Sequence, residues 1–121
     1  MRSGKLRVPS NDLSKRILSE VGFEDRLEGF RLRERSGPMP VTMYSFEEVV
    51  SLLNDPHPRL DFEELEGWVR SVMGDTELAE QIGAAIKKGD NDRERTYSIR
   101  DFMEERLNQC RIEGGHNENI V

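Results

Sequence analysis

The chain has 121 residues and a mass of 14.0 kDa, which fits a single domain. Hydrophobic residues make up 35% of the sequence and charged residues another 35%, so we expect a small core beneath a heavily charged surface. The net charge of −6 argues against a general nucleic-acid coat protein, which would need a dominant basic surface. No apolar run is long enough to span a membrane, and the single cysteine, Cys110, excludes an internal disulfide. We therefore expect a cytoplasmic protein without a membrane anchor.

Charge is distributed unevenly along the chain. Residues 1–40 carry nine Lys and Arg against six Asp and Glu, whereas residues 41–69 carry one against seven. We expect these two regions to pair within the fold or with a second copy of the chain.

The first predicted helix covers residues 9–22. Ser10 or Asn11 can cap its start, and Leu13, Ile17 and Val21 recur on one face. Gly22 is placed where a left-handed residue would end the helix.

Residues 29–44 hold two β-prone stretches, 29–35 and 41–44, on either side of a Gly-Pro turn. This pattern fits a small β-hairpin over residues 30–44. It also fits an irregular loop whose apolar side chains plug a helical core, and the sequence leaves both open.

Two further helices are expected at 45–55 and 61–73, joined by a stiff, proline-containing connector. Ser45 and Glu48 form the pattern of a capping box, and Asp61 can cap the next helix. Gly67 lies inside the second of these helices, where glycine costs roughly 1 kcal/mol relative to alanine, so we expect a close packing contact there.

The stretch from Trp68 to Ile82 breaks at Gly74 and Asp75. We expect Gly74 to end one helix in a left-handed conformation and Asp75 to cap the next, over residues 75–89. Trp68 is expected in the core, the alternative being an anchor for a partner.

The last predicted helix covers residues 98–114, begins at a Ser98 cap and turns Cys110 toward the core, after a solvated loop at 90–96. Together these elements predict a mainly α fold, a compact bundle of about five helices with or without the hairpin. We expect one helical domain over residues 10–112, with flexible segments at 1–9 and 113–121.

We find no candidate catalytic, metal or cofactor site. His57, Cys110 and His116 lack the paired spacing of a zinc site, and the acidic residues around Asp90 lack the glycine and glutamate of a calcium loop. No phosphate-binding glycine motif and no nucleophile with a nearby base is evident, so we do not expect an enzyme.

Residues 76–83, TELAEQIG, look like the first helix and turn of a helix-turn-helix regulator. A recognition helix should follow, but Gly89 and two aspartates stand where it should run. A DNA-binding role would depend on the nearby basic residues Lys87, Lys88, Arg93 and Arg95.

The central stretch resembles an uncharacterised family of small archaeal and bacterial helical proteins with the motif W-[IV]-x-x-V-[IL]-G-D-x-x-L-A. The matching residues are Trp68, Val69, Val72, Met73, Gly74, Asp75, Leu78 and Ala79. The preceding N-D-F-A of that family is replaced here by residues 63–66, EELE. The resemblance implies a compact helical module and brings no activity or cofactor with it.

We therefore expect a non-enzymatic protein-interaction or accessory module whose partner is another protein or a second copy of the chain. Trp68, Lys87, Lys88, Arg93 and Arg95 are its candidate interaction residues. The alternative is a DNA-binding regulator that uses residues 75–95, and a small-molecule enzyme is the third possibility.

Overall fold

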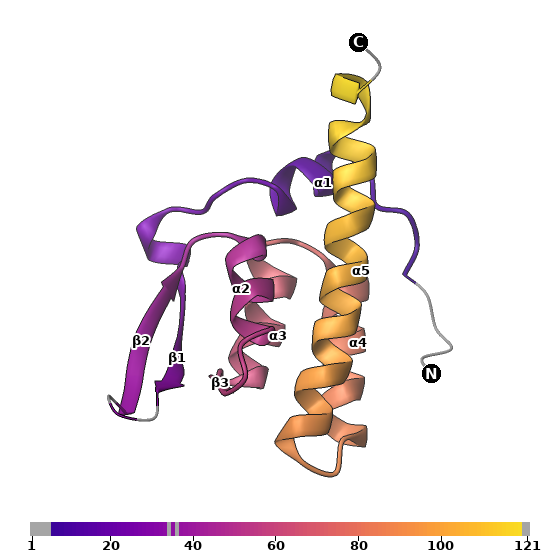
Figure 1. Ribbon diagram of the computed structural model, residues 1–121. Helices are drawn as coiled ribbons and strands as arrows, with labels where there is room; N and C mark the ends of the chain where they lie inside the picture. Colours follow the sequence, from indigo (N-terminus) through magenta and orange to yellow (C-terminus); the bar gives the residue numbers. More distant parts are fainter. Residues whose placement is uncertain (1–5, 34, 36, 120–121) are drawn as a thin grey trace.

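The computed structural model describes residues 6–33, 35 and 37–119, with side chains described as far as residue 112. Its elements, in chain order, are α1 (Asn11–Ile17), the 3-10 turn η1 (Phe23–Asp25), β1 (Leu27–Arg33), β2 (Gly37–Met43), α2 (Phe46–Leu53), β3 (Pro58–Arg59), α3 (Phe62–Ser71), α4 (Thr76–Lys88) and α5 (Asp92–Asn119). The fold is mainly α, as predicted, but it is not purely a helical bundle because a small sheet stands at one side. Helices α2 and α3 lie between that sheet and the α4–α5 pair (Figure 1).

The core is formed where the apolar stripes of α2 to α5 meet. Its largest fully buried apolar side chains are Ile17, Met43, Phe46, Leu52, Leu53, Leu65, Met73, Leu78, Ile82, Ile99 and Met103. Within α2, α4 and α5 these positions repeat at helical spacing, so each of these helices buries one stripe. Ile17 of α1, Met43 of β2 and Met73, which follows α3, complete the core. No helix in the described part of the chain has the length and apolar character needed to cross a membrane.

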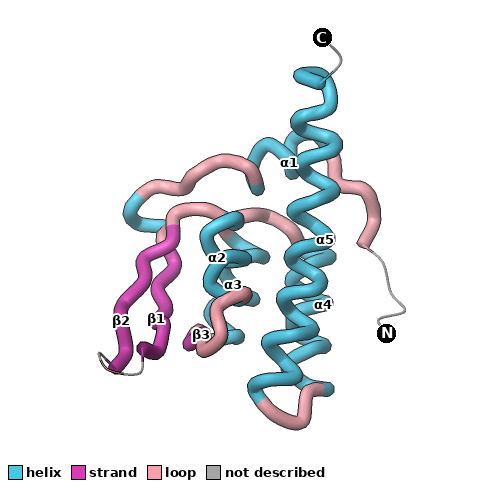
Figure 2. The backbone as a smooth tube through the Cα atoms, viewed as in Figure 1, coloured by secondary structure: helices cyan, strands magenta, loops and turns pink. Residues whose placement is uncertain are grey.

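The predicted hairpin is confirmed, and it is longer than residues 30–44 at its first strand. Strands β1 and β2 pair antiparallel from Leu27 with Met43 to Arg33 with Gly37, and Gly37 has the left-handed φ of 70° in the turn. The third strand was missed, because β3 lies in the segment predicted as a connector. There Arg59 pairs with Phe30 of β1. Figure 2 shows β3 as a short strand. Proline favours an extended backbone in the residue before it, and the extended segment at residues 58–59 pairs with the edge of β1.

Strand β2 is an outer strand of this sheet, whose order is β2-β1-β3. Pro38 and Pro40 occupy alternate positions of β2 and have no backbone N–H to donate. In sheets, proline is confined to positions whose N–H side would face solvent. The outer edge of β2 therefore offers few donors to an added strand.

The first helix is shorter than predicted. Ser10 caps α1 by accepting from the Leu13 backbone N–H (3.1 Å), but the helix ends at Ile17 and not near Gly22. Gly22 has φ of −76° and precedes η1, so the predicted left-handed helix end is wrong. The reason is tertiary, since the Val21 N–H donates to the Tyr44 carbonyl (2.7 Å) and draws the chain out of the helix.

The caps predicted for α2, α3 and α4 are confirmed. The Ser45 hydroxyl accepts a hydrogen bond from the Glu48 N–H (3.2 Å). The Glu48 carboxylate, however, accepts from the Tyr44 N–H (2.6 Å) and not from the Ser45 N–H, as a capping box would require. Gly74 has φ of 74°, the left-handed helix end that the sequence predicted. The close contact predicted at Gly67 is wrong, because an added Cβ there would meet no heavy atom within 4 Å.

Helix α5 begins well before the predicted residue 98. The predicted loop at 90–96 is wrong because Asn91 caps a helix that starts at Asp92. The Asn91 side chain accepts from the Glu94 N–H (2.9 Å), and the Glu94 carboxylate accepts from the Asp90 N–H (3.0 Å). Ser98 therefore lies inside the helix and caps nothing.

The two segments predicted to be flexible are only partly described. The α5 backbone continues to Asn119, beyond the predicted end at 114, whereas residues 1–5, 120 and 121 lie outside the described residues. Leu6 is buried, and its N–H donates to the Glu105 carboxylate (2.9 Å). The flexibility of 1–9 and 113–121 stays a prediction.

Asp75 does more than cap α4, because it also binds a buried arginine. Arg106 is 1% exposed and donates to Asp75 through Nε (2.7 Å) and Nη2 (3.2 Å), and to Glu77 (2.9 Å). Burial alone would lower the pKa of Arg106, but the hydrogen bonds and negative charges of Asp75 and Glu77 outweigh it and raise that pKa. The Gly-Asp break is thus the point at which α4 is joined to α5 by charge.

Candidate functional site

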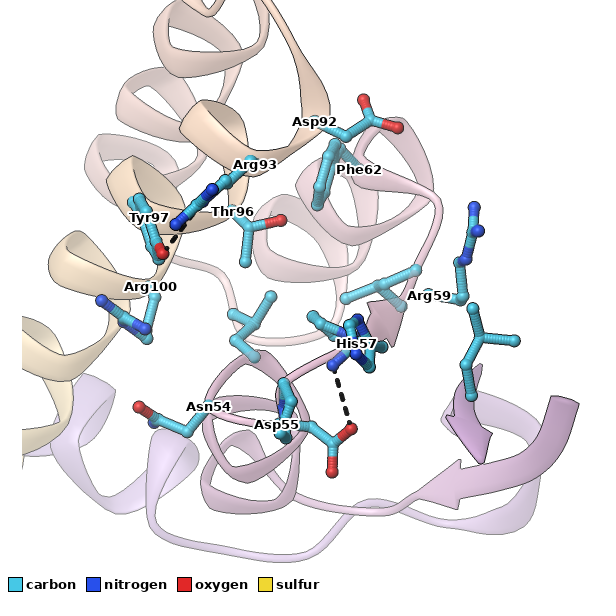
Figure 3. A pocket seen from close by; sticks show the side chains of 15 residues that line it. Asn54, Asp55, His57, Arg59, Phe62, Asp92, Arg93, Thr96, Tyr97 and Arg100 are labelled. Carbon is cyan, nitrogen blue, oxygen red and sulfur yellow. Dashed lines mark hydrogen bonds between the residues drawn. The ribbon is translucent and has the colours of Figure 1, made fainter. Parts of the chain in front are cut away.

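A groove of about 710 Å³ opens between the end of α2, the β3 segment and the first turns of α5. We call it the α5 groove. Leu32, Leu53, Phe62 and residues 54–60 line it, together with Asp92, Arg93, Thr96, Tyr97 and Arg100 of α5 (Figure 3). Its volume lies in the range that small-molecule and peptide-anchor sites occupy.

The wall formed by residues 54–60 is fixed by hydrogen bonds at its start and at its middle. The Asn54 side chain donates to the Val50 carbonyl (3.0 Å) and to Glu104 of α5 (2.9 Å), which ties the end of α2 to α5. At the middle of the wall, the Leu32 N–H donates to the His57 carbonyl (3.3 Å), which holds the segment to β1. The prolines on either side of His57 restrict the backbone there.

The opposite wall is one face of α5. Arg93, Tyr97 and Arg100 are spaced i, i+4 and i+7, so they lie above one another on the helix surface. Arg93 Nε donates to the Tyr97 hydroxyl (3.2 Å), and the Arg100 guanidinium carbon lies 4.9 Å from the Tyr97 ring centre. This face exists because the helix starts at Asp92.

The charge of the groove is dominated by arginine. Asp55 forms an ion pair with Arg31 (3.5 Å) and Asp92 with Arg95 (3.0 Å), so both aspartates of the groove already have a cationic partner. Among the described residues, no carboxylate forms an ion pair with Arg59, Arg93 or Arg100.

The tyrosine hydroxyl responds to this charge. The hydrogen bond from Arg93, its positive charge and, to a smaller extent, that of Arg100 lower the pKa of Tyr97. Burial acts in the opposite direction and raises the pKa of a tyrosine, so the lowering comes from the arginines. The groove is thus suited to an anionic ligand.

The structure separates the basic residues that the sequence grouped together. Lys87 and Lys88 are exposed at the end of α4, and Arg93 faces the α5 groove. Arg95 turns the other way and donates to the Ile86 (3.0 Å) and Gly89 (2.8 Å) carbonyls, where it closes the end of α4. These four residues do not form one surface.

Trp68 lies in the core, where it was expected. It is 6% exposed, and its indole N–H donates to the Asp25 carbonyl (2.6 Å). Little of the ring is left for a partner to contact, and its role as a partner anchor gains no support.

Sequence reasoning missed Arg59, Tyr97 and Arg100. The spacing R-x-x-x-Y-x-x-R over residues 93–100 was the available signal, and it was hidden because 90–96 had been assigned to a loop. The Asn91 and Glu94 pair is a capping pattern that could have shown the earlier helix start.

Three features of the described residues concern metal binding and catalysis. No group of three or more His, Cys, Asp or Glu in the described part of the chain is placed to hold a metal ion. The His57 ring makes no hydrogen bond to a described nucleophile or carboxylate, and only its backbone N–H donates to Asp55 (3.3 Å). Cys110 is fully buried, and burial raises the pKa of its thiol.

Comparison of the chain with protein-family models, with curated proteins and with solved structures finds no match. The resemblance to an uncharacterised family of small helical proteins therefore rests on the sequence motif alone, and it stays a prediction.

Proposed function

We propose that the protein is a non-enzymatic interaction module whose α5 groove binds an acidic segment of a partner protein. One observation carries the proposal: Arg59, Arg93 and Arg100 line the groove without a carboxylate partner among the described residues. By contrast, seven other arginines form an ion pair or a hydrogen bond with a carboxylate or carbonyl group of the protein: Arg16, Arg26, Arg31, Arg70, Arg95, Arg106 and Arg111.

The shape of the groove supports an extended ligand. Arg93 and Arg100 lie on one side, Arg59 lies on the other, and His57 and Phe62 stand between them (Figure 3). A peptide with acidic residues at both ends and an apolar residue between them would match this order. Addition of the peptide to the sheet at β2 is disfavoured, because Pro38 and Pro40 remove donors from that edge.

An acidic protein segment suits the groove better than DNA does. The chain carries a net charge of −6, whereas a protein that binds the DNA backbone needs a dominant basic surface.

The DNA-binding alternative has one observation in its favour. Only three residues separate the end of α4 at Lys88 from the start of α5 at Asp92, which corrects the expectation that no helix follows directly. A recognition helix, however, must present the side chains of its first turn to base edges. Here that turn holds two carboxylates, Arg93, which lines the α5 groove, and Arg95, which is bound to the end of α4.

Fluorescence anisotropy with a fluorescein-labelled oligoglutamate peptide tests the proposal, with oligoglutamine and duplex DNA as parallel probes. We expect salt-sensitive binding of oligoglutamate alone. The Arg93→Gln and Arg100→Gln variants should each weaken it by about two- to fivefold, the value of an exposed ion pair. Lys15→Gln, which removes one charge from α1 outside the groove, is the matched control and should leave affinity unchanged.

Two outcomes would contradict the proposal. Absence of oligoglutamate binding at low salt would rule out the acidic-segment ligand. Binding of duplex DNA that is lost in a Lys87→Gln, Lys88→Gln double variant would favour the regulator alternative instead.

A further inference from the structure

The α5 side of the groove holds three hydrogen-bond donors close together. Arg93 Nε donates to the Tyr97 hydroxyl oxygen (3.2 Å), so the hydroxyl proton itself is left free to donate to a ligand. The guanidinium carbons of Arg93 and Arg100 lie 5.7 Å and 4.9 Å from the Tyr97 ring centre. Tyr97 stands between the two arginines in Figure 3. We call Arg93, Tyr97 and Arg100 the oxyanion subsite.

The charge of the subsite indicates which anion it fits. A carboxylate carries one negative charge and is satisfied by a single bidentate arginine. Two guanidinium groups beside one hydroxyl leave one positive charge uncompensated when a carboxylate binds. A phosphate monoester carries about −1.5 to −2 near neutral pH and has three acceptor oxygens, which matches two arginines and a phenol.

We infer that the oxyanion subsite binds the phosphoryl group of a phosphorylated side chain in the partner's acidic segment. This inference rests on the proposed function, since it names the ligand chemistry at one end of the same groove. Arg59, at the other end, then binds an ordinary carboxylate of that segment. Clusters of arginine are the usual means of recognising phosphorylated motifs.

The test compares two labelled peptides of the same acidic sequence, one with a central serine and one with phosphoserine there, on the full chain. We expect the phosphoserine peptide to bind about tenfold more tightly, because hydrogen bonds to charged groups are the stronger class. Arg93→Gln and Arg100→Gln should each remove most of this preference. Arg93→Lys and Arg100→Lys keep the charge and should restore part of it.

Arg59→Gln is the matched control within the groove. It should weaken both peptides alike and leave their affinity ratio unchanged, because Arg59 lies outside the subsite. Thermal unfolding of each variant, followed by circular dichroism, checks that the fold is kept.

The outcomes separate the two proposals. Equal binding of both peptides, or a preference that survives Arg93→Gln and Arg100→Gln, overturns the phosphoryl inference and leaves the acidic-segment function standing. Failure of both peptides to bind overturns the function itself. Competition by inorganic phosphate or adenosine monophosphate at concentrations as low as those of the phosphoserine peptide overturns the assignment to a partner segment.

Discussion

At the residue scale, Asp75 stabilises the turn between α3 and α4. Asp75 caps α4 through its bond from Leu78 N–H (3.0 Å) and also neutralises the buried Arg106. An N-cap aspartate could be predicted from the Gly-Asp sequence. Its partner could not, because Arg106 lies 31 positions away and nothing local marks it as buried.

Asp75→Asn separates these two roles, because asparagine keeps the capping oxygen and loses the charge. We expect a loss of about 3 kcal/mol or more in the free energy of unfolding, since the buried Arg106 is left with the partly exposed Glu77 as its one carboxylate partner among the described residues. Asp61→Asn, at the exposed cap of α3, is the matched control and should cost about 0.5 kcal/mol or less. Equal losses in urea unfolding would show that the ion pair contributes nothing.

Because Cys110 is buried, we expect the free energy of unfolding to depend on pH. Burial raises its pKa in the folded protein, so the unfolded thiol loses its proton first as the pH rises. The stabilising contribution is therefore complete below the unfolded pKa of about 8.5 and is lost as the pH rises toward the folded value, by up to about 1.4 kcal/mol per pH unit. Cys110→Ala should be less stable at neutral pH and should lack this alkaline loss. Urea unfolding at a series of pH values measures this difference. If the free energy of unfolding of the two proteins changed with pH in the same way, the prediction would be wrong.

At the scale of elements, most predicted N-caps are confirmed, with Ser98 as the exception, whereas the elements that depend on tertiary contacts were predicted wrongly. Ser10, Ser45, Asp61 and Asp75 were predicted as caps and all accept the expected backbone bonds. The errors have other causes: α1 is cut short by a bond to the Tyr44 carbonyl, and β3 forms because the edge of β1 captures its segment. Such non-local pairings leave no periodic pattern in the sequence.

Replacing either of two glycines in these elements by alanine should change the stability of the protein, in opposite directions. Gly67→Ala should stabilise the protein by about 0.5–1 kcal/mol, because α3 has open space there and alanine favours the helix. At Gly29, an added Cβ would lie 2.8 Å from the Arg59 carbonyl and 2.9 Å from Leu52, so Gly29→Ala should destabilise by about 1–3 kcal/mol. Thermal unfolding measures both. A stabilising Gly29→Ala would mean that β1 and β3 are not packed as described.

At the scale of the molecule, the candidate site depends on a long-range arrangement. The α5 groove joins residues 54–60 to residues 92–100, and the two segments meet only because α2 packs against α5 through Asn54 and Glu104. The class of fold could be predicted from the apolar periodicity of the sequence, and the hairpin from its turn residues. The groove could not be predicted, because a charged run such as residues 90–96 has the same composition in a loop and in a helix.

The central claim is that the α5 groove is the surface that binds a partner, and amide chemical-shift mapping by NMR tests it most directly. On titration with oligoglutamate, we expect the largest shifts in residues 54–60 and 92–100, and their loss in the Arg93→Gln, Arg100→Gln double variant. Shifts confined to other surfaces, such as the end of α4 at Lys87 and Lys88, or shifts that persist unchanged in the double variant, would contradict the account.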